Sequence, residues 1–455
     1  MFRITKENVG RFRIAKRVIG PSPRVAGRLA VAAAALLPAT GFAQQSIIAQ
    51  PNLLTMENAL TQQNGAAPGL PPGLYFGTQL VTGYDSNVAR QSPGPNVVAS
   101  QIDQAALLAA FDHTYERQHV YFAADVGRNV YRNDPLYDYT SQDLQIGLQS
   151  NFPSDFSSNL QFARYATLAN QGDFQGQQRN VLTQNRVDGW FRFPLASEWR
   201  GVLAAGAGRL RNSEVLDQPT DVNAVQVQAG VRYEAGTANY VNILARSLQA
   251  RYPEINQLPP GTLLALSPFH DRGIDAETRW RFSGSSQLIG HAGFVSRRSE
   301  DAQVSWRNFS GPAYDLSYIW TPGAKARVTF LVLRATGEPG DNDYLSAVKR
   351  TVRITPAYYP TENLQFEAKW EWNSIRYASV PAAAIPPALV PQLGNLAQFL
   401  APRDDILTGE GAAVVWTPLR WLQLRLSYAR EARGSNQGIW SYADRLTLFR
   451  LQARI

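Results

Sequence analysis

The stretch Val414–Tyr428 shows the pattern that recurs along this chain. From position 422 to 428 every second residue is apolar, and the residues between them are polar. Successive side chains of a strand point to opposite faces, so this pattern predicts a β-strand with one apolar and one polar face. Residues 417–420 form a tight turn before it, with Trp416 and Trp421 at the strand ends. This unit is typical of a lipid-spanning β-hairpin.

The same alternation recurs from Leu74 to the end of the chain. It predicts about eighteen strands, an even number, as single-chain bacterial barrels have. Sixteen is the alternative, because two of the segments alternate less regularly, Tyr240–Arg251 and Gln287–Arg297. The predicted strands are Leu74–Tyr84, Ile102–Phe111, Val120–Tyr131, Asp143–Phe152, Phe156–Leu168, Val181–Phe193, Trp199–Leu210, Val225–Tyr233, Tyr240–Arg251, Ile274–Phe282, Gln287–Arg297, Phe309–Trp320, Ala326–Arg334, Ala347–Tyr358, Leu364–Asn373, Ile406–Trp416, Leu422–Glu431 and Arg445–Ile455.

The connections between these strands alternate in length. Short turns join even-numbered strands to the next odd ones, and longer segments rich in Gly, Pro, Asn and Asp join odd to even. The longer segments are 85–101, 132–140, 170–180, 253–271 and 378–404. Outer-membrane barrels have short periplasmic turns and long extracellular loops. The sequence therefore predicts an all-β, transmembrane, antiparallel up-and-down barrel.

Aromatic residues mark the short-turn rim and are expected to form a girdle at the inner membrane interface, where amphipathic rings prefer to lie. Proline follows most of them and ends the strand ladder. The girdle candidates are Phe152, Phe193, Trp320, Tyr359, Trp416 and Trp421.

A large soluble all-β protein, such as a sandwich or a propeller, is the alternative fold. Strands of soluble proteins average about 5–6 residues, whereas these approach ~10. At a rise of ~3.3 Å and a tilt of ~40°, ten residues span roughly 25 Å, the height of the apolar band of outer-membrane barrels. Strand length therefore favours the membrane barrel.

The N-terminus has the features of an export signal. A basic region precedes the apolar run Leu29–Leu37, and the small residues Gly41 and Ala43 predict cleavage before Gln44. A mitochondrial transit peptide is the alternative. We therefore divide the chain into a signal peptide (1–43), a periplasmic extension (44–73), which could instead be a plug or a partner-binding segment, and the barrel (74–455).

Charge and composition exclude several classes of function. The formal net charge is +8, but eight basic residues and one acidic residue lie within residues 1–43, which leaves a nearly neutral remainder. Binding to nucleic acid therefore has no electrostatic basis. The chain has no cysteine, so it has neither disulfides nor thiolate metal sites. His113, His119, His270 and His291 lack metal-ligand spacing, and no catalytic motif is present, so neither an enzyme nor a cofactor is expected.

Closing about eighteen strands at ~4.7 Å spacing and ~40° tilt gives a diameter of roughly 35 Å, enough for an aqueous channel. The polar face of the strands would line it. Its mixed charges argue against a strongly ion-selective pore, whose wall carries one sign. The lumen candidates are Tyr121, Tyr165, Arg186, Asp188, Trp190, Arg192, Asp275, Glu277, Arg279, Arg281, Glu367, Lys369, Glu371 and Arg425.

Three features of the wall and rim leave alternatives open. The inward aromatics Tyr121, Tyr165 and Trp190 could stack on sugar rings or could be ordinary wall residues. The carboxylates Glu367 and Glu371 share a strand face, where a polar wall is favoured over acid–base chemistry. The long loop at 378–404 either covers or enters the pore or remains outside it.

The segment Gly83–Arg90 reads Gly-Tyr-Asp-Ser-Asn-Val-Ala-Arg. It resembles the opening segment of a family of bacterial porin-like barrels that includes the EpsL-type outer-membrane proteins of exopolysaccharide synthesis systems. The resemblance implies a role in polysaccharide export, with the polymer and periplasmic synthesis or export proteins as partners. It also implies that Asp85 and Asn87 shape the first loop, through an Asx turn rather than a cation contact.

The sequence therefore predicts a bacterial outer-membrane channel that serves exopolysaccharide export. A general or solute-specific porin for uptake is the first alternative, and a non-conducting adhesin or scaffold is the second. Membrane lipids and the barrel-assembly machinery are the expected partners in every case.

Overall fold

A computed structural model describes residues 73–95, 97–169, 179–236, 239–254, 267–337, 347–377 and 402–454. The expected signal peptide, nearly all of the periplasmic extension and most of the segment 378–404 lie outside these residues. Among the described residues, no helix has the length and apolar character needed to cross a bilayer.

Eighteen strands form one sheet. Their bounds are β1 (Gly73–Asp85), β2 (Ser100–Tyr115), β3 (Gln118–Tyr131), β4 (Tyr139–Asn151), β5 (Ser157–Leu168), β6 (Val181–Ala196), β7 (Trp199–Asn212), β8 (Val222–Ala235), β9 (Asn239–Arg251), β10 (Phe269–Ser283), β11 (Ser286–Ser299), β12 (Phe309–Trp320), β13 (Ala326–Gly337), β14 (Ala347–Thr361), β15 (Leu364–Tyr377), β16 (Asp404–Leu419), β17 (Leu422–Ser435) and β18 (Tyr442–Arg454). Short 3-10 helices lie in the connections: η2 (Pro135–Tyr137), η3 (Pro153–Asp155), η4 (Val215–Thr220), η6 (Ala302–Arg307) and η9 (Gly438–Trp440).

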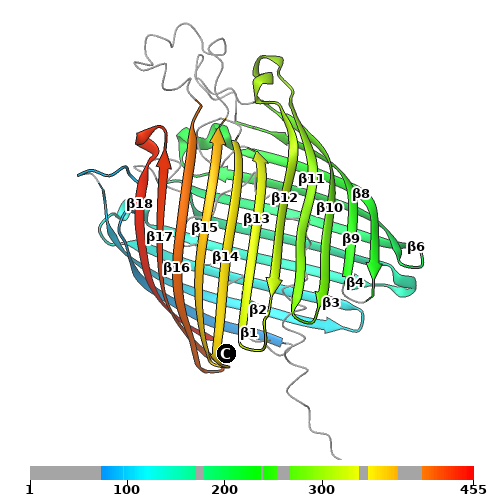
Figure 1. Cartoon of the computed structure of the whole chain (residues 1–455), viewed down its shortest axis with the longest axis horizontal. Helices are drawn as coiled ribbons and strands as arrows, with labels where there is room; N and C mark the ends of the chain where they lie inside the picture. Colours follow the sequence, from blue (N-terminus) through cyan, green and yellow to red (C-terminus); the bar gives the residue numbers. More distant parts are fainter. Residues whose placement is uncertain are drawn as a thin grey trace, which may run out of the picture.

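Each strand pairs antiparallel with the next in sequence, and β1 also pairs with β18, which closes the sheet into a barrel (Figure 1). The register of this closing joint runs from Gly77 opposite Arg454 to Asp85 opposite Leu446. The expected all-β up-and-down barrel is confirmed. The count is eighteen rather than sixteen, because β9 and β11 are full strands despite their less regular alternation.

The two rims differ in the length of their connections. Short turns, such as residues 116–117 and 420–421, lie at the rim where β1 begins and β18 ends, and longer connections lie at the opposite rim. In Figure 1 the C-terminus marks the short-turn rim at the bottom of the view. We call this the periplasmic rim and its opposite the extracellular rim.

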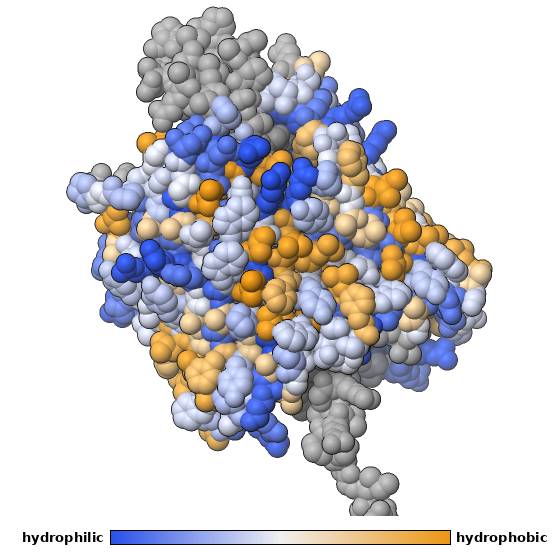
Figure 2. All heavy atoms as spheres, viewed as in Figure 1, coloured by the Kyte–Doolittle hydropathy of each residue, from blue (hydrophilic) through white to orange (hydrophobic). Residues whose placement is uncertain are grey.

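The outer face of the barrel is apolar over a wide band. Side chains such as Leu107 (69% exposed) and Ile274 (64% exposed) point away from the sheet with no protein covering them. Figure 2 shows hydrophobic residues across the middle of one face and hydrophilic ones toward the top of the view. An apolar surface of this extent requires lipid rather than water around it.

Most of the girdle candidates are exposed at the periplasmic rim: Phe152, Trp320, Trp416 and Trp421. The ring of Phe193 lies across Gly201 on the neighbouring strand, at a position where a Cβ would clash with the ring.

Tyr359 was wrongly assigned to the girdle. Tyr358 is opposite Phe366 and carries the outward position, whereas Tyr359 interacts electrostatically with Arg327 and Glu367, which face inward. The side-chain period of a strand is two, so an error of one residue reverses the face.

The inner wall as candidate functional site

All the lumen candidates lie on strand positions between outward-facing neighbours, so their side chains point into the barrel. They come from β3, β5, β6, β10, β15 and β17. Their side chains are buried or half-buried, except Arg281, which is exposed near the periplasmic rim. Their role in transport remains a prediction.

The inner face of β9–β11 carries two ion pairs. Arg297 donates to Asp271 through Nε (2.8 Å) and a terminal nitrogen (2.9 Å), and these residues are register partners on β11 and β10. The Arg297 guanidinium also lies 3.8 Å from the centre of the Phe269 ring. Arg246 Nε lies 3.4 Å from Asp275. Bidentate guanidinium–carboxylate pairs fix geometry as well as charge, so this part of the wall is rigidly organised.

The inner face of β14, β15 and β17 has a second set of pairs. A terminal nitrogen of Arg425 lies 2.8 Å from Glu367. Glu371 accepts from Arg353 Nε at 2.6 Å and lies 2.9 Å from Lys369 Nζ. Glu367 and Glu371 are therefore components of an ion-paired wall, and cations neutralise each of them.

A recess lies beside these pairs on the inner wall formed by β15–β18. Its floor is made by small residues of β16, Gly409, Gly411 and Ala413, and the charged side chains of Glu367 and Arg425 border it. A smaller recess lies over β7, next to Arg186, Asp188 and two glutamines of β8. In both cases a strand with small inward residues separates strands with long polar ones.

The inward aromatics are already engaged by the wall. The Arg192 guanidinium lies 3.9 Å from the centre of the Trp190 ring. Tyr165 accepts a hydrogen bond from Gln145 at 2.9 Å. The ring of Tyr121 lies across Gly147 of β4, at a position where a Cβ would clash with it.

Three strands close to one another carry inward carboxylates without an inward Lys or Arg. Asp125 on β3 and Asp143 on β4 are direct register partners. Arg450, on β18, attracts Asp125. Asp112 on β2 instead accepts a hydrogen bond from His119 Nε2 at 3.0 Å. This part of the wall is locally acidic, in contrast to the paired regions.

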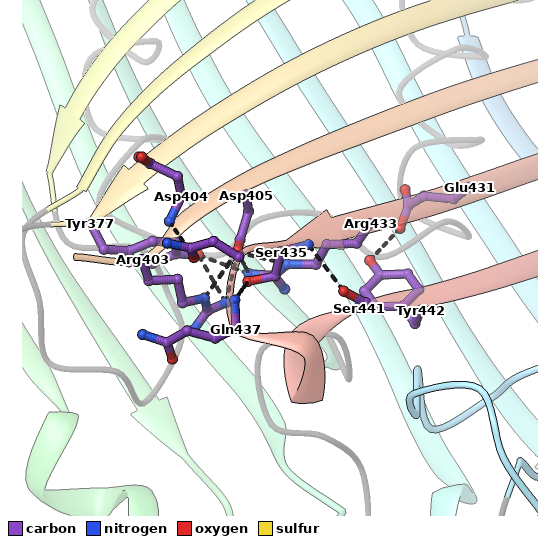
Figure 3. Close-up of polar contacts among 11 residues, drawn as sticks. Tyr377, Arg403, Asp404, Asp405, Glu431, Arg433, Ser435, Gln437, Ser441 and Tyr442 are labelled. Carbon is purple, nitrogen blue, oxygen red and sulfur yellow. Dashed lines mark hydrogen bonds and ion pairs between the residues drawn. The ribbon is translucent and has the colours of Figure 1, made fainter. Parts of the chain in front are cut away.

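A buried cluster at the extracellular end joins β15, β16 and β17 (Figure 3). Asp405 accepts from Arg403 (2.9 Å) and from Arg433 Nε (2.8 Å), and it is 1% exposed. The Tyr377 hydroxyl accepts from Arg433 (2.9 Å) and Arg403 (3.3 Å). The Arg403 guanidinium lies 3.8 Å from the centre of the Trp440 ring. The sequence pattern did not reveal this cluster, because its members come from distant positions.

The first loop folds against the inner wall at the extracellular end. Val88 and Ala89 are buried with inward residues of β1, β2 and β18. The backbone N–H of Asn87 donates to Asp85 at 2.9 Å, the contact that defines an Asx turn. The Asn87 side chain also accepts from Gln91 N–H at 2.9 Å. Both motif residues therefore shape this loop through hydrogen bonds.

Arg90 fixes this loop to both ends of the barrel sheet. It lies 3.1 Å from Asp85 on β1 and 3.2 Å from Asp444 on β18, and it also donates to the Asn87 carbonyl. Burial lowers the pKa of the Arg90 guanidinium, but Asp85 and Asp444 raise it by more, so its net pKa lies above the usual value. Arg90 therefore remains charged while buried.

The described residues contain no group of three or more His, Asp or Glu side chains that could hold a metal ion. No protein-family model matches the chain. No curated protein matches it either. The resemblance of Gly83–Arg90 to EpsL-type proteins gains no support from these comparisons and stays a prediction.

The chain is similar in shape to several crystal structures. One is OccK1 (OpdK) of Pseudomonas aeruginosa, with 11% identity, 84% of this chain and 98% of that chain covered, and a TM-score of 0.44. Another is OccAB4 of Acinetobacter baumannii, with 8% identity, coverage of 84% and 98%, and a TM-score of 0.45. A third is OprD of Pseudomonas aeruginosa, with 9% identity, coverage of 84% and 94%, and a TM-score of 0.44. These values mark a distant likeness in architecture.

The geometry of this chain itself defines its class. An even number of antiparallel strands closes on itself, so the sheet has no open edge that lipid would leave unsatisfied. The outer band is apolar, the inner face is polar, and short turns occupy one rim. The chain is a β-barrel of the bacterial outer membrane.

Proposed function

We propose that this barrel is a passive channel that lets small polar solutes cross the outer membrane. The observation that carries the proposal is the polar inner wall of the closed barrel, on which charges are paired, as Glu367 and Arg425 are. A recess beside this pair, with small residues of β16 as its floor, gives a passing solute a place to contact the wall.

The surrounding charges suit weak and selective binding. Glu367 and Arg425 satisfy each other at 2.8 Å, so neither presents a full unpaired charge to the recess. A solute with hydroxyl or amide groups gains hydrogen bonds there without having to neutralise a charged wall. Conduction requires binding that favours entry but remains weak enough for release. A wall of paired charges meets both requirements.

The test is solute flux through the purified, refolded protein. Single-channel recordings in planar bilayers should show open conductance, and liposome swelling should report entry of small neutral sugars and amino acids. A closed bilayer trace would eliminate the channel and favour the non-conducting adhesin or scaffold.

The recess itself is tested by Gly409→Leu. A Cβ at Gly409 meets only Glu371 Cβ, at 3.8 Å, so the backbone accepts a side chain there, and leucine would extend into the recess. Solute entry should fall severalfold while ion conductance falls less. The matched control is Gly434→Leu, at an outward position with no atom within 4 Å of a new Cβ. Equal solute entry in both variants would show that the recess takes no part.

Export of an exopolysaccharide is the second candidate. It is favoured by the aromatics on the inner face of three nearby strands, Tyr121, Tyr165 and Trp190, since aromatic rings can stack on sugar rings. Deleting the gene separates the two candidates. Loss of secreted polymer with unchanged solute uptake would favour export, and the reverse result would favour the diffusion channel.

A further inference from the structure

Arginines that face outward are confined to one half of the barrel. Within the described strands, outward positions of the periplasmic half carry no Lys or Arg, whereas arginines recur at outward positions of the extracellular half. Six of them lie next to the extracellular edge of the apolar band: Arg164, Arg209, Arg251, Arg272, Arg334 and Arg350. When outward-facing arginines lie on one side of the membrane only, the two leaflets around the barrel are expected to differ in charge.

Several of these arginines form a row across β5–β9. Strand register places Arg164 opposite Asn185, Asn185 opposite Arg209, Arg209 opposite Asn223, and Asn223 opposite Arg251. Arg164 donates to the Asn185 side chain at 3.0 Å. Asparagine can orient a guanidinium but cannot neutralise it. The row therefore presents net positive charge to the membrane.

Arg334 and Arg350 face each other directly on β13 and β14. Their other register neighbours, Tyr314 on β12 and Ser374 on β15, are uncharged. Arg334 Nε is buried and has no hydrogen-bond partner among the described residues. Like charges directly opposite on neighbouring strands repel each other and destabilise the sheet. An anion between the two guanidinium groups would remove this repulsion.

We propose that Arg334 and Arg350 bind a phosphate group of a phosphorylated glycolipid in the outer leaflet. The planar forks of two guanidinium groups match the oxygens of one phosphate. The next outward pair toward the periplasm is Val332 and Val352, which are register partners and exposed. An acyl chain can follow these apolar side chains while its headgroup phosphate reaches the arginines. The row across β5–β9 provides a second contact of the same kind.

The test measures lipid binding to the full-length protein in detergent by native mass spectrometry. The probes are diphosphorylated lipid A, the same lipid without its phosphates, and inorganic phosphate. One arginine near an anionic lipid surface contributes about fivefold in affinity, so Arg334→Gln/Arg350→Gln should weaken binding of diphosphorylated lipid A by about 25-fold. The dephosphorylated lipid should bind both proteins weakly and equally.

The matched control is Arg376→Gln/Arg430→Gln. These arginines also face outward in the extracellular half, but Asp404 (3.1 Å) and Glu410 (3.3 Å) already neutralise them. This variant should bind the lipid within about twofold of the unaltered protein. Retained heat-modifiable mobility shows that a variant is folded, and this control does not depend on the proposed channel function.

Three outcomes would overturn the proposal. The first is equal binding of diphosphorylated lipid A by the Arg334/Arg350 variant and the unaltered protein. The second is equal binding of the phosphorylated and dephosphorylated lipids, which would indicate adsorption through acyl chains alone. The third is an effect of the substitutions on inorganic phosphate without any effect on the lipid.

Discussion

The inner faces of β2–β4 and of β9–β11 differ in how their charges are balanced. On β10 and β11, Asp271 and Arg297 are register partners and satisfy each other with two hydrogen bonds. On β3 and β4 the register partners are two carboxylates, Asp125 and Asp143. The first arrangement stabilises the wall. The second places two negative charges next to each other, and mobile cations in the lumen must screen their electrostatic field.

The difference indicates that stability and selectivity reside in separate parts of the barrel. Removing one member of a buried ion pair leaves the other charge buried and uncompensated. Removing one of two facing carboxylates instead relieves repulsion and changes which ions enter. The two regions should therefore respond differently to equivalent substitutions.

The largest effect is expected for Asp271→Ala. The Arg297 side chain is 1% exposed and would lose both hydrogen bonds from its carboxylate partner. The free energy of unfolding should fall by about 3–5 kcal/mol. Urea denaturation of the refolded protein in detergent, followed by tryptophan fluorescence, measures it. The control is Asp404→Ala, which breaks an exposed pair with Arg376 and should cost less than about 1 kcal/mol. Equal losses in the two variants would contradict the prediction.

Replacing both members of the buried pair should cost less than replacing one. Asp271→Leu/Arg297→Met substitutes apolar side chains of similar size, which leaves no unpaired charge in the wall. Such replacements of buried ion pairs are often neutral or stabilising, so we expect a loss below about 1 kcal/mol. The same denaturation experiment measures it, and a loss as large as that of Asp271→Ala would show that the pair contributes more than charge balance.

The acidic region is tested through ion selectivity. Asp125→Asn/Asp143→Asn removes two inward charges, each worth about 0.4 kcal/mol to a cation ~10 Å away in water, or about twofold in concentration. The preference for cations over anions should fall by about 16-fold, because the cation concentration falls and the anion concentration rises by about fourfold each. Reversal potentials under a KCl gradient in planar bilayers measure it. Asp103→Asn is the control, because Asp103 faces outward and pairs with Arg132. An unchanged reversal potential in the double variant would mean that these carboxylates do not face the ion path.

The smallest effect is expected on the outer surface. Arg430→Gln breaks an exposed pair with Glu410 (3.3 Å) in the extracellular half. Solvent screens such pairs, so the change in unfolding free energy should be below about 0.5 kcal/mol. A loss above 1 kcal/mol in the denaturation experiment would show that this surface contributes to the fold itself.

The strands could be predicted from the sequence because contact with lipid constrains each outward-facing residue separately. Each outward residue must be apolar within the band, which produces a period of two without knowledge of any partner strand. The same reasoning placed Glu367 and Arg425 on the inner face, although it did not show that they pair. The aromatic–proline pattern of the rim misassigned Tyr359, because that pattern does not show to which face of the strand a ring points.

Contacts between distant positions could not be predicted in this way. Arg403 and Arg433 meet on Asp405 because the register of β16 and β17 brings their extracellular ends together, and alternation alone does not fix that register. Val88 and Ala89 are apolar residues in a polar loop, a pattern that indicates burial, and both are buried.

The contact of Arg90 with both Asp85 and Asp444 has a consequence for how the barrel forms. Every other pair of neighbouring strands is joined by a turn or loop, so chain connectivity holds those strands near each other from the start. The first and last strands have no such link and must find each other across nearly the whole chain, which makes their pairing a slow, late event. Arg90 can neutralise Asp444 only once that meeting has occurred. The ion pair therefore forms only after β1 and β18 have paired. It then slows the separation of these two strands, but it does not speed their first meeting.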